Sequence, residues 1–206
     1  MNALPSKFWQ SCWLLLLLLL STAAAAQTLA LRRYNTANGL PQTMVYAICQ
    51  DGRGQLWAGT QGGVCVFNGQ EFQTFDGRQG LPDNHVRAVA PAPDGTMWLG
   101  HEYGGVSWLR GERVHRCRLP GLRQPAHVRS IYCATNEVVW VGTAGQGLWR
   151  LQCGPRDTVL THFGRAQGLP SDSVNCVKPG PGGQLWVATT GGLAALPTTT
   201  SRQLGS

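Results

Sequence analysis

The chain has 206 residues, a length that suits one domain, and only 13% of them are charged while 27 are glycine. Its formal net charge of +7 could suggest a nucleic-acid partner, but the basic residues are scattered arginines with one loose group between positions 110 and 123. Such a distribution is typical of a solvated surface rather than of a track for phosphates, so we exclude nucleic acid as a partner.

The first 26 residues have the layout of a secretory signal peptide. Lys7 is the only charge before an apolar run at 14–20, and small residues follow, with Ala24 and Ala26 placed as a cleavage site. The sequence predicts cleavage before Gln27, so that residues 27–206 form a periplasmic or secreted protein. The run is too short for a membrane-spanning helix, and no second long apolar segment follows, so we expect no membrane span in the mature chain.

A fourfold repeat fills the rest of the chain. The tryptophans that define it recur about every 41 to 46 positions, and each has a valine twelve positions before it. Six positions before three of these valines stands the tripeptide Gly-Leu-Pro. The tryptophans are Trp57, Trp98, Trp140 and Trp186, and the valines are Val45, Val86, Val128 and Val174. Because the tryptophan, the valine and the Gly-Leu-Pro tripeptide recur together at this period, the sequence indicates stacked units of one supersecondary structure.

Each unit is predicted to hold four short antiparallel strands. The first strands are expected at 45–50, 86–91, 128–133 and 174–179, and a tight turn leads from each into the strand that carries the tryptophan. A pair of glycines reverses the chain into a third strand, and "EFQTF" at 71–75 is the fourth strand of the first unit. This size and order predict an all-β fold of propeller blades starting near 45, 86, 128 and 174. The glycines turn hairpins, and no helix follows them as a phosphate-binding loop requires.

The two ends of the repeat do not match. Residues 29–34 read as a fourth strand without its own unit, because Tyr34 precedes Gly39 by the same spacing that separates Phe75 from Gly80. The last unit lacks a fourth strand, so 29–34 could complete it and close a small ring. We expect an open arc instead, whose exposed blade faces make the isolated chain associate.

The pattern "GLP-x3-V…DG-x-LW-x-GT-x-GG" resembles the two-component regulator propeller repeat of periplasmic sensor regions in bacterial hybrid histidine kinases. The resemblance covers Tyr34 to about Leu196, and the third copy departs from it, with "GLRQP" from Gly121 and no Asp-Gly turn. It implies a propeller that usually has seven blades and is followed by a β-sandwich, a membrane helix and a kinase. The sequence holds none of these, so the chain looks like an amino-terminal fragment or remnant of such a sensor.

The resemblance implies an exported ligand-sensing module that is not itself an enzyme. Its ligand would be a carbohydrate or another polar environmental cue, and its partners would be further propeller blades or signalling domains of a parent sensor. One alternative is a lyase, because some propellers with similar short blades are lyases, although His85, His101 and Glu102 are the only acid–base groups on offer. A protein-interaction scaffold or a nonfunctional truncated remnant is the other.

The segments that differ between blades predict where a ligand binds. Two kinds of segment lie at the same end of a propeller: the loop between the second and third strands, and the segment before each first strand. Both vary in sequence from blade to blade while the strands repeat. Blade two has the loop "HEY", which offers an imidazole, a carboxylate and a phenol for a polar ligand. The candidate ligand-binding residues are Asp83, Asn84, His85, Arg87, His101, Glu102, Tyr103, His127 and Arg129. An ordinary solvated loop is the competing interpretation, and no catalytic residue, metal site or cofactor is predicted.

The repeated aromatic residues and the cysteines are interpreted as structural. A tryptophan needed in every blade belongs to the blade-to-blade core, so Trp57, Trp98, Trp140 and Trp186 are expected there. Six cysteines follow the signal peptide, at unrelated points of the repeat and without a CxxC pair. Free buried thiols are the first interpretation, and a disulfide between neighbouring blades is the second.

Overall fold

The computed structural model describes residues 31–123, 125–154 and 157–197. The predicted signal peptide therefore lies outside the described residues. Of the predicted strand at 29–34, residues 29 and 30 also lie outside them, and residues 31–34 form no strand. Tyr34 instead places its ring against Phe67 and Phe72 of the first blade, with centroids 5.1 and 5.6 Å away.

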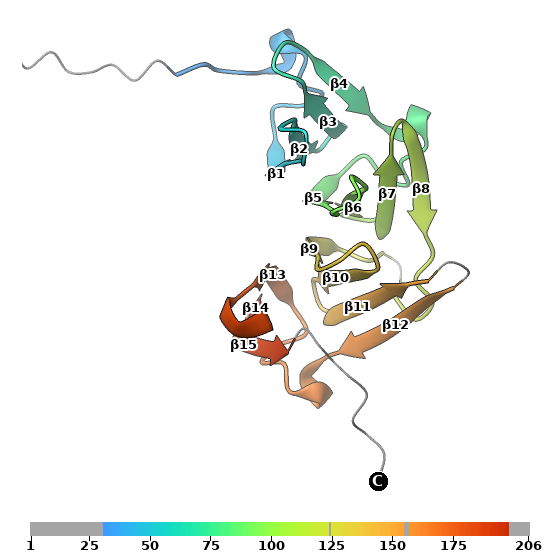
Figure 1. Ribbon diagram of the computed structural model, residues 1–206, viewed down its shortest axis with the longest axis vertical. Coiled ribbons are helices and arrows are strands. Elements are labelled where there is room, and N and C mark those ends of the chain that lie inside the picture. Colours follow the sequence, from blue (N-terminus) through green and yellow to red (C-terminus); the bar gives the residue numbers. More distant parts are fainter. Residues whose placement is uncertain (1–30, 124, 155–156, 198–206) are drawn as a thin grey trace, which may run out of the picture. The chain divides into compact units, whose positions relative to one another are not determined.

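The strands form one antiparallel sheet per repeat, and consecutive strands lie side by side in each (Figure 1). Blade 1 holds β1 (Val45–Gln50), β2 (Leu56–Thr60), β3 (Gly63–Phe67) and β4 (Phe72–Phe75). Blade 2 holds β5 (Val86–Pro91), β6 (Met97–His101), β7 (Val106–Arg110) and β8 (Arg113–Cys117). Blade 3 holds β9 (Val128–Cys133), β10 (Val138–Thr143), β11 (Leu148–Cys153) and β12 (Thr158–Phe163). Blade 4 holds β13 (Val174–Pro179), β14 (Gln184–Thr189) and β15 (Gly192–Pro197), and has three strands within the described residues. The all-β propeller architecture predicted from the repeat is confirmed.

A β-bulge explains the apolar pattern of the first strands. A regular strand would place its first and fourth residues on opposite faces of the sheet. The pairing register shifts by one residue between Val86 and Ala88 on β5, and the same shift occurs on β1 and β13. The extra residue brings Val86 and Val89 to the same side, where both approach Gly59 of the preceding blade.

The Gly-Leu-Pro motif ends a short 3-10 turn before each of three blades. These turns are η1 (Thr36–Asn38), η2 (Gly77–Gln79) and η3 (Arg165–Gln167), and a glycine with positive φ follows each of them. Gly80, for example, has φ 101° and donates its N–H to the carbonyl of Gly77, which closes the turn. A residue with a side chain is strained at this φ, so the motif requires glycine there. A fourth short turn, η4 (Pro181–Gly183), joins β13 to β14.

The hydrophobic core lies between blades. The inner strands pack in chain order, with β1 against β5, β5 against β9 and β9 against β13. Each of three apolar clusters joins the third strand of one blade to the first strand of the next. Val64 and Val86 belong to one cluster, Val106 and Val128 to another, and Leu148 and Val174 to the third. Trp57, Trp98 and Trp140 are buried, whereas Trp186 of the last blade is 36% exposed. None of the described helices is long and apolar enough to cross a membrane.

Candidate functional site

Backbone contacts bring the predicted site together at one end of blades 2 and 3. The N–H of Glu102, just after β6, donates to the carbonyl of His85, just before β5 (2.9 Å). Gly104 then forms an isolated parallel bridge with Ala126, which lies just before β9 of blade 3. These contacts hold the loop 102–105 over the segment before each of the two inner strands.

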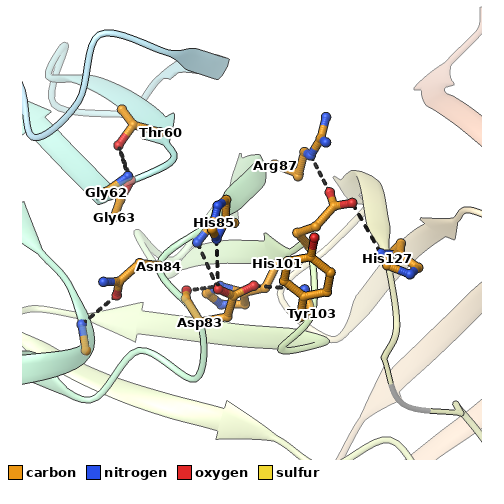
Figure 2. A network of polar contacts seen from close by, with 12 residues as sticks. Thr60, Gly62, Gly63, Asp83, Asn84, His85, Arg87, His101, Tyr103 and His127 are labelled. Atoms are coloured by element: carbon orange, nitrogen blue, oxygen red, sulfur yellow. Dashed lines mark hydrogen bonds and ion pairs between the residues drawn. The ribbon is translucent and has the colours of Figure 1, made fainter.

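The Asp83 carboxylate fixes this loop (Figure 2). One of its oxygens accepts from the backbone N–H of His85 (3.0 Å) and lies 3.3 Å from His85 Nδ1, and the other accepts from the backbone N–H of Tyr103 (2.8 Å). Although burial acts to raise the pKa of Asp83, these hydrogen bonds hold it below its usual value. Asp83 is therefore ionised and pins Tyr103 to the segment before β5.

His101 lies beneath the loop and is fully buried. Its Nδ1–H donates to the carbonyl of Asp83 (2.6 Å), which leaves Nε2 as an acceptor for the hydroxyl of Ser107 (2.8 Å). Burial lowers the pKa of His101 to about 4, so the ring is neutral at pH 7. The structure gives this predicted ligand-binding residue two protein partners and no exposed surface.

Glu102 links the two blades through its side chain. Its carboxylate forms an ion pair with Arg87 on β5, and its other oxygen accepts from His127 Nδ1 just before β9 (3.2 Å). The Arg87 guanidinium also lies over the ring of Tyr46 on blade 1, 4.4 Å from its centroid. One chain of contacts thus runs from blade 1 through Arg87 and Glu102 to blade 3. Figure 2 shows Arg87 and His127 on the two sides of the carboxylate that joins them.

Tyr103 presents the exposed aromatic surface of the group. Its side chain is 55% exposed, and its ring meets the rings of His85 and His127 edge-on, with centroids 5.8 and 5.5 Å apart. Figure 2 shows the phenol between the imidazoles of His85 and His127. A ring that is held in place and surrounded by polar groups can stack on a flat ligand face and let hydrogen bonds orient it.

Two of the predicted residues have partners outside this group of side chains. Asn84 accepts from the backbone N–H of Gly77 (2.8 Å) and so supports the 3-10 turn before blade 2. Asp172 makes the same bond to Arg165 in the last blade (2.8 Å), which marks this position as structural. Arg129 donates to the side-chain oxygen of Asn175 in blade 4 (2.7 Å). The equivalence of Asn84 with Asp172 in the repeat was a signal that could have separated Asn84 from the site.

The opposite end of blades 1 and 2 carries a groove that the sequence analysis did not identify. It has a volume of about 730 Å³ and opens between the turns that follow β1 and β5. Buried Trp57 and Phe75, stacked with centroids 6.2 Å apart, line it together with Gln55 and Gln73. The Asp51 carboxylate at its edge accepts from Trp57 Nε1 (2.9 Å) and from two backbone N–H groups of its own turn, so it serves the fold.

The cysteines that the structure describes form no disulfide. Burial raises the pKa of Cys49 and Cys65 to about 11 and that of Cys117 and Cys133 to about 12. Thiols with such pKa values stay protonated at neutral pH, and the protonated form is a poor nucleophile. Within the described ranges, no three histidine, cysteine or acidic side chains lie close enough together to hold a metal ion.

Two segments of the chain, residues 39–62 and 80–103, match the family model described as Two component regulator propeller. They include the Gly-Leu-Pro turn, the first two strands and the following loop of blades 1 and 2. No curated protein sequence matches the chain significantly.

Several solved structures resemble the chain. The extracellular domain of a protein described as a hybrid two component system of B. thetaiotaomicron has a TM-score of 0.67 at 24% identity, over 79% of this chain and 22% of its own. The extracellular domain of a protein described as a one component system of the same organism has a TM-score of 0.67 at 18% identity, over 90% and 25%. Virginiamycin B lyase from Staphylococcus aureus has a TM-score of 0.58 at 12% identity, over 77% and 57%.

At these identities the structural likeness establishes the fold alone, and this chain spans a quarter or less of the length of the two extracellular domains. The sequence match is more specific, because it falls on the segments that form the turn, the inner strands and the loop. Blades 3 and 4 continue the same strand register. The chain is therefore similar to the two component regulator propeller family over residues 39–62 and 80–103.

Proposed function

We propose that this chain is an exported ligand-sensing module of a two-component signalling system and that it binds a polar, carbohydrate-like cue around Tyr103. Three observations support the proposal: the family match, the signal-peptide layout and the extracellular two component domains among the structural neighbours. The observation that carries the position of the site is the half-exposed ring of Tyr103, fixed between His85 and His127.

The geometry favours binding over catalysis at this place. The imidazole of His101 is buried with both nitrogens engaged, and the carboxylate of Glu102 is already shared by Arg87 and His127. A general acid or base must reach a substrate proton, which these groups do not do in this arrangement. A lyase activity, suggested by one group of structural neighbours, therefore has less support than a ligand-sensing role.

The test of the site is a binding measurement on the chain itself. A panel of neutral and carboxylated oligosaccharides is screened by saturation-transfer NMR against the wild type, Tyr103→Ala, Tyr103→Phe and Gln55→Ala, which lies in the opposite groove. We expect an oligosaccharide signal that Tyr103→Ala removes and Tyr103→Phe keeps, because stacking needs the ring rather than the hydroxyl. A signal lost in Gln55→Ala and kept in Tyr103→Ala would move the site to the groove, and no signal with any saccharide would refute a carbohydrate-like ligand.

The signalling role is tested by reading the DNA on both sides of the coding sequence. We expect the DNA around the coding sequence to encode a histidine kinase or a response regulator, in the same reading frame or the same operon. A neighbourhood without any two-component gene would count against the role, whatever the binding measurement gives.

A further inference from the structure

One side chain from each blade stands at the same irregular position of the first strand. The pairing of each first strand with the second strand skips one residue, so this residue is bulged out of the ladder. The bulge is the same in all four blades, whereas the bulged side chain differs. The bulged residues are Tyr46, Arg87, Arg129 and Asn175. Blades 2 and 3 therefore both present a guanidinium on equivalent backbone.

Blade 2 shows what an arginine at this position binds. Glu102 follows the second strand, and its N–H donates to the carbonyl of His85 (2.9 Å). Its carboxylate forms an ion pair with Arg87 of the same blade and accepts from Nδ1 of His127, which precedes the first strand of the next blade. The complete arrangement thus consists of an arginine, a carboxylate and a donor from the next blade.

Blade 3 repeats this arrangement without the carboxylate. Ala144 takes the place of Glu102, because its N–H donates to the carbonyl of His127 by the equivalent bond (2.9 Å). Arg129 is exposed and donates to the neutral amide oxygen of Asn175 (2.7 Å). Within the part of the chain that the structure describes, Arg129 forms no ion pair. The guanidinium of blade 3 therefore lacks the partner that its equivalent in blade 2 has.

Two further donors belong to the neighbouring strand of blade 4. Ser173 precedes this strand as His127 precedes that of blade 3, and it forms an isolated bridge with Ala144. Because the amide oxygen of Asn175 accepts from Arg129, the amide nitrogen keeps its two N–H groups for another acceptor. A guanidinium, an amide nitrogen and a hydroxyl can all donate, and a carboxylate is the group that only accepts.

The acidic side chains before the first strands of blades 2 and 4 are engaged by backbone groups. Asp83 accepts from the N–H groups of His85 and Tyr103, and Asp172 accepts from the N–H of Arg165 (2.8 Å). These carboxylates hold turns and loops of the fold, so a carboxylate for Arg129 has to come from outside the chain.

From the comparison of blades 2 and 3 we infer that Arg129, with Ser173 and Asn175, binds a carboxylate of the ligand as Arg87 binds Glu102, and that the ligand is an acidic saccharide that contains a uronic acid. This inference rests on the proposed binding role of Tyr103 and narrows the polar cue to an anionic one. Arg129 follows His127, whose ring contacts Tyr103, by two strand residues or roughly 7 Å. A saccharide stacked on Tyr103 can therefore reach Arg129 with a carboxylate of the same or the adjoining sugar.

The test compares oligouronates with their methyl esters, which keep the sugar rings and remove the charge. NMR titrations with oligomers of galacturonate, glucuronate and mannuronate follow the backbone N–H signals of Ala144 and Tyr103. We expect one of these acids to shift both signals and to bind the wild type roughly tenfold or more tightly than its ester, because the charge-assisted hydrogen bonds are lost with the charge.

Two variants and a control assign this preference to Arg129. Arg129→Gln removes the guanidinium, and Ala144→Glu supplies it with a carboxylate from within the chain, so each should abolish the preference for the acid. Arg113→Gln removes an exposed charge on β8 and should keep the preference. Acid and ester bound equally by the wild type, or a preference that survives Arg129→Gln with unchanged circular dichroism, would overturn the carboxylate site.

The same titrations separate this site from the proposed site at Tyr103. Ester binding that Tyr103→Ala removes, without a preference for the acid, would overturn the carboxylate site and leave the site at Tyr103 standing. Acid binding that shifts Ala144, depends on Arg129 and is unaffected by Tyr103→Ala would do the reverse. If no oligouronate shifts Ala144, the carboxylate site is overturned, and the wider saccharide panel then decides on Tyr103 alone.

Discussion

Blades 1 and 2 have the same strand register but close their second hairpins with different residues. In blade 1 the hydroxyl of Thr60 donates to the carbonyl of Gly63 (2.8 Å) and accepts from the N–H of Gly62 (3.0 Å), so the turn closes on itself. In blade 2 the equivalent residue is His101, which contacts Ser107 and the carbonyl of Asp83. Thr189 repeats both bonds, to Gly192 and Gly191, and Thr143 repeats the donated bond, to the carbonyl of Gly147.

The difference shows how this repeat acquires a distinct loop. A larger buried side chain replaces a local turn bond by bonds to another segment, and that segment then holds Tyr103 outward. Both blades have a buried tryptophan, and only blade 2 has the contact between His101 and Asp83. The variants of the tryptophans are expected to have larger effects than the variants of the second hairpin.

The largest expected effect comes from the shared part. Trp57→Ala and Trp98→Ala should each lower the free energy of unfolding by about 3–5 kcal/mol, because each removes a buried aromatic side chain and leaves a cavity. Trp186→Ala is the control, and it should cost clearly less because that side chain is partly exposed. Urea denaturation followed by circular dichroism measures all three. Equal losses for Trp186 and Trp98 would show that burial does not set the cost.

The His101 position should make stability depend on pH. The pKa of His101 is about 4 in the folded chain and near 6.5 when unfolded. Above pH 6.5 neither state binds the proton, whereas between pH 6.5 and 4 only the unfolded state binds it, so stability falls through this window by on the order of 3 kcal/mol. His101→Thr, which restores the residue of the other blades, should flatten the urea midpoints between pH 7 and 4.5. An unchanged slope in this variant would assign the titration to another group.

A smaller loss is expected from Asp83→Ala. The substitution removes the acceptor for His85 and for the backbone N–H of Tyr103, at a cost of about 1–3 kcal/mol. Ser171→Ala, at the same place in blade 4, removes the hydrogen bonds to the N–H of Ser173 and to the hydroxyl of Thr190, and it should cost less because the lost side chain is uncharged. Thermal unfolding measures both. In amide hydrogen exchange the N–H of Tyr103 should exchange faster only in Asp83→Ala, and unchanged protection there would contradict the role given to this carboxylate.

The smallest expected effect lies in the hairpin of blade 1. Thr60→Val keeps the side-chain shape but removes the buried hydrogen bond to Gly63 and the partly buried one to Gly62, with a cost of about 1 kcal/mol. Thr189→Val in blade 4 should cost no more, since its hydroxyl is only partly buried. The urea denaturation midpoints of the two variants measure the difference between their losses of stability. A larger loss for Thr189 would show that the burial of the hydroxyl does not set the cost.

The sequence by itself determined the blade architecture. The four first strands begin and end at the residues that the repeat indicated, for example Val86 and Pro91, because valine spacing, turn glycines and buried tryptophans are local signals that recur in register. It also located the varied loop around Tyr103, since a position that differs in an otherwise constant repeat is visible without coordinates. The 3-10 turns before the blades were not predicted, although the capping side chains of Asp76 and Gln79 are readable in the sequence.

Only the tertiary structure decided which of the chosen residues are exposed. His101 and Tyr103 stand two positions apart, yet one is buried against Asp83 and the other reaches solvent, because their contacts come from a segment about 20 residues away in the chain. The same holds for Trp186, which has the sequence context of Trp140 but lacks a covering neighbour among the described blades. Burial depends on what packs against a residue, and packing between blades joins residues some forty positions apart, so no local pattern in the sequence could fix it.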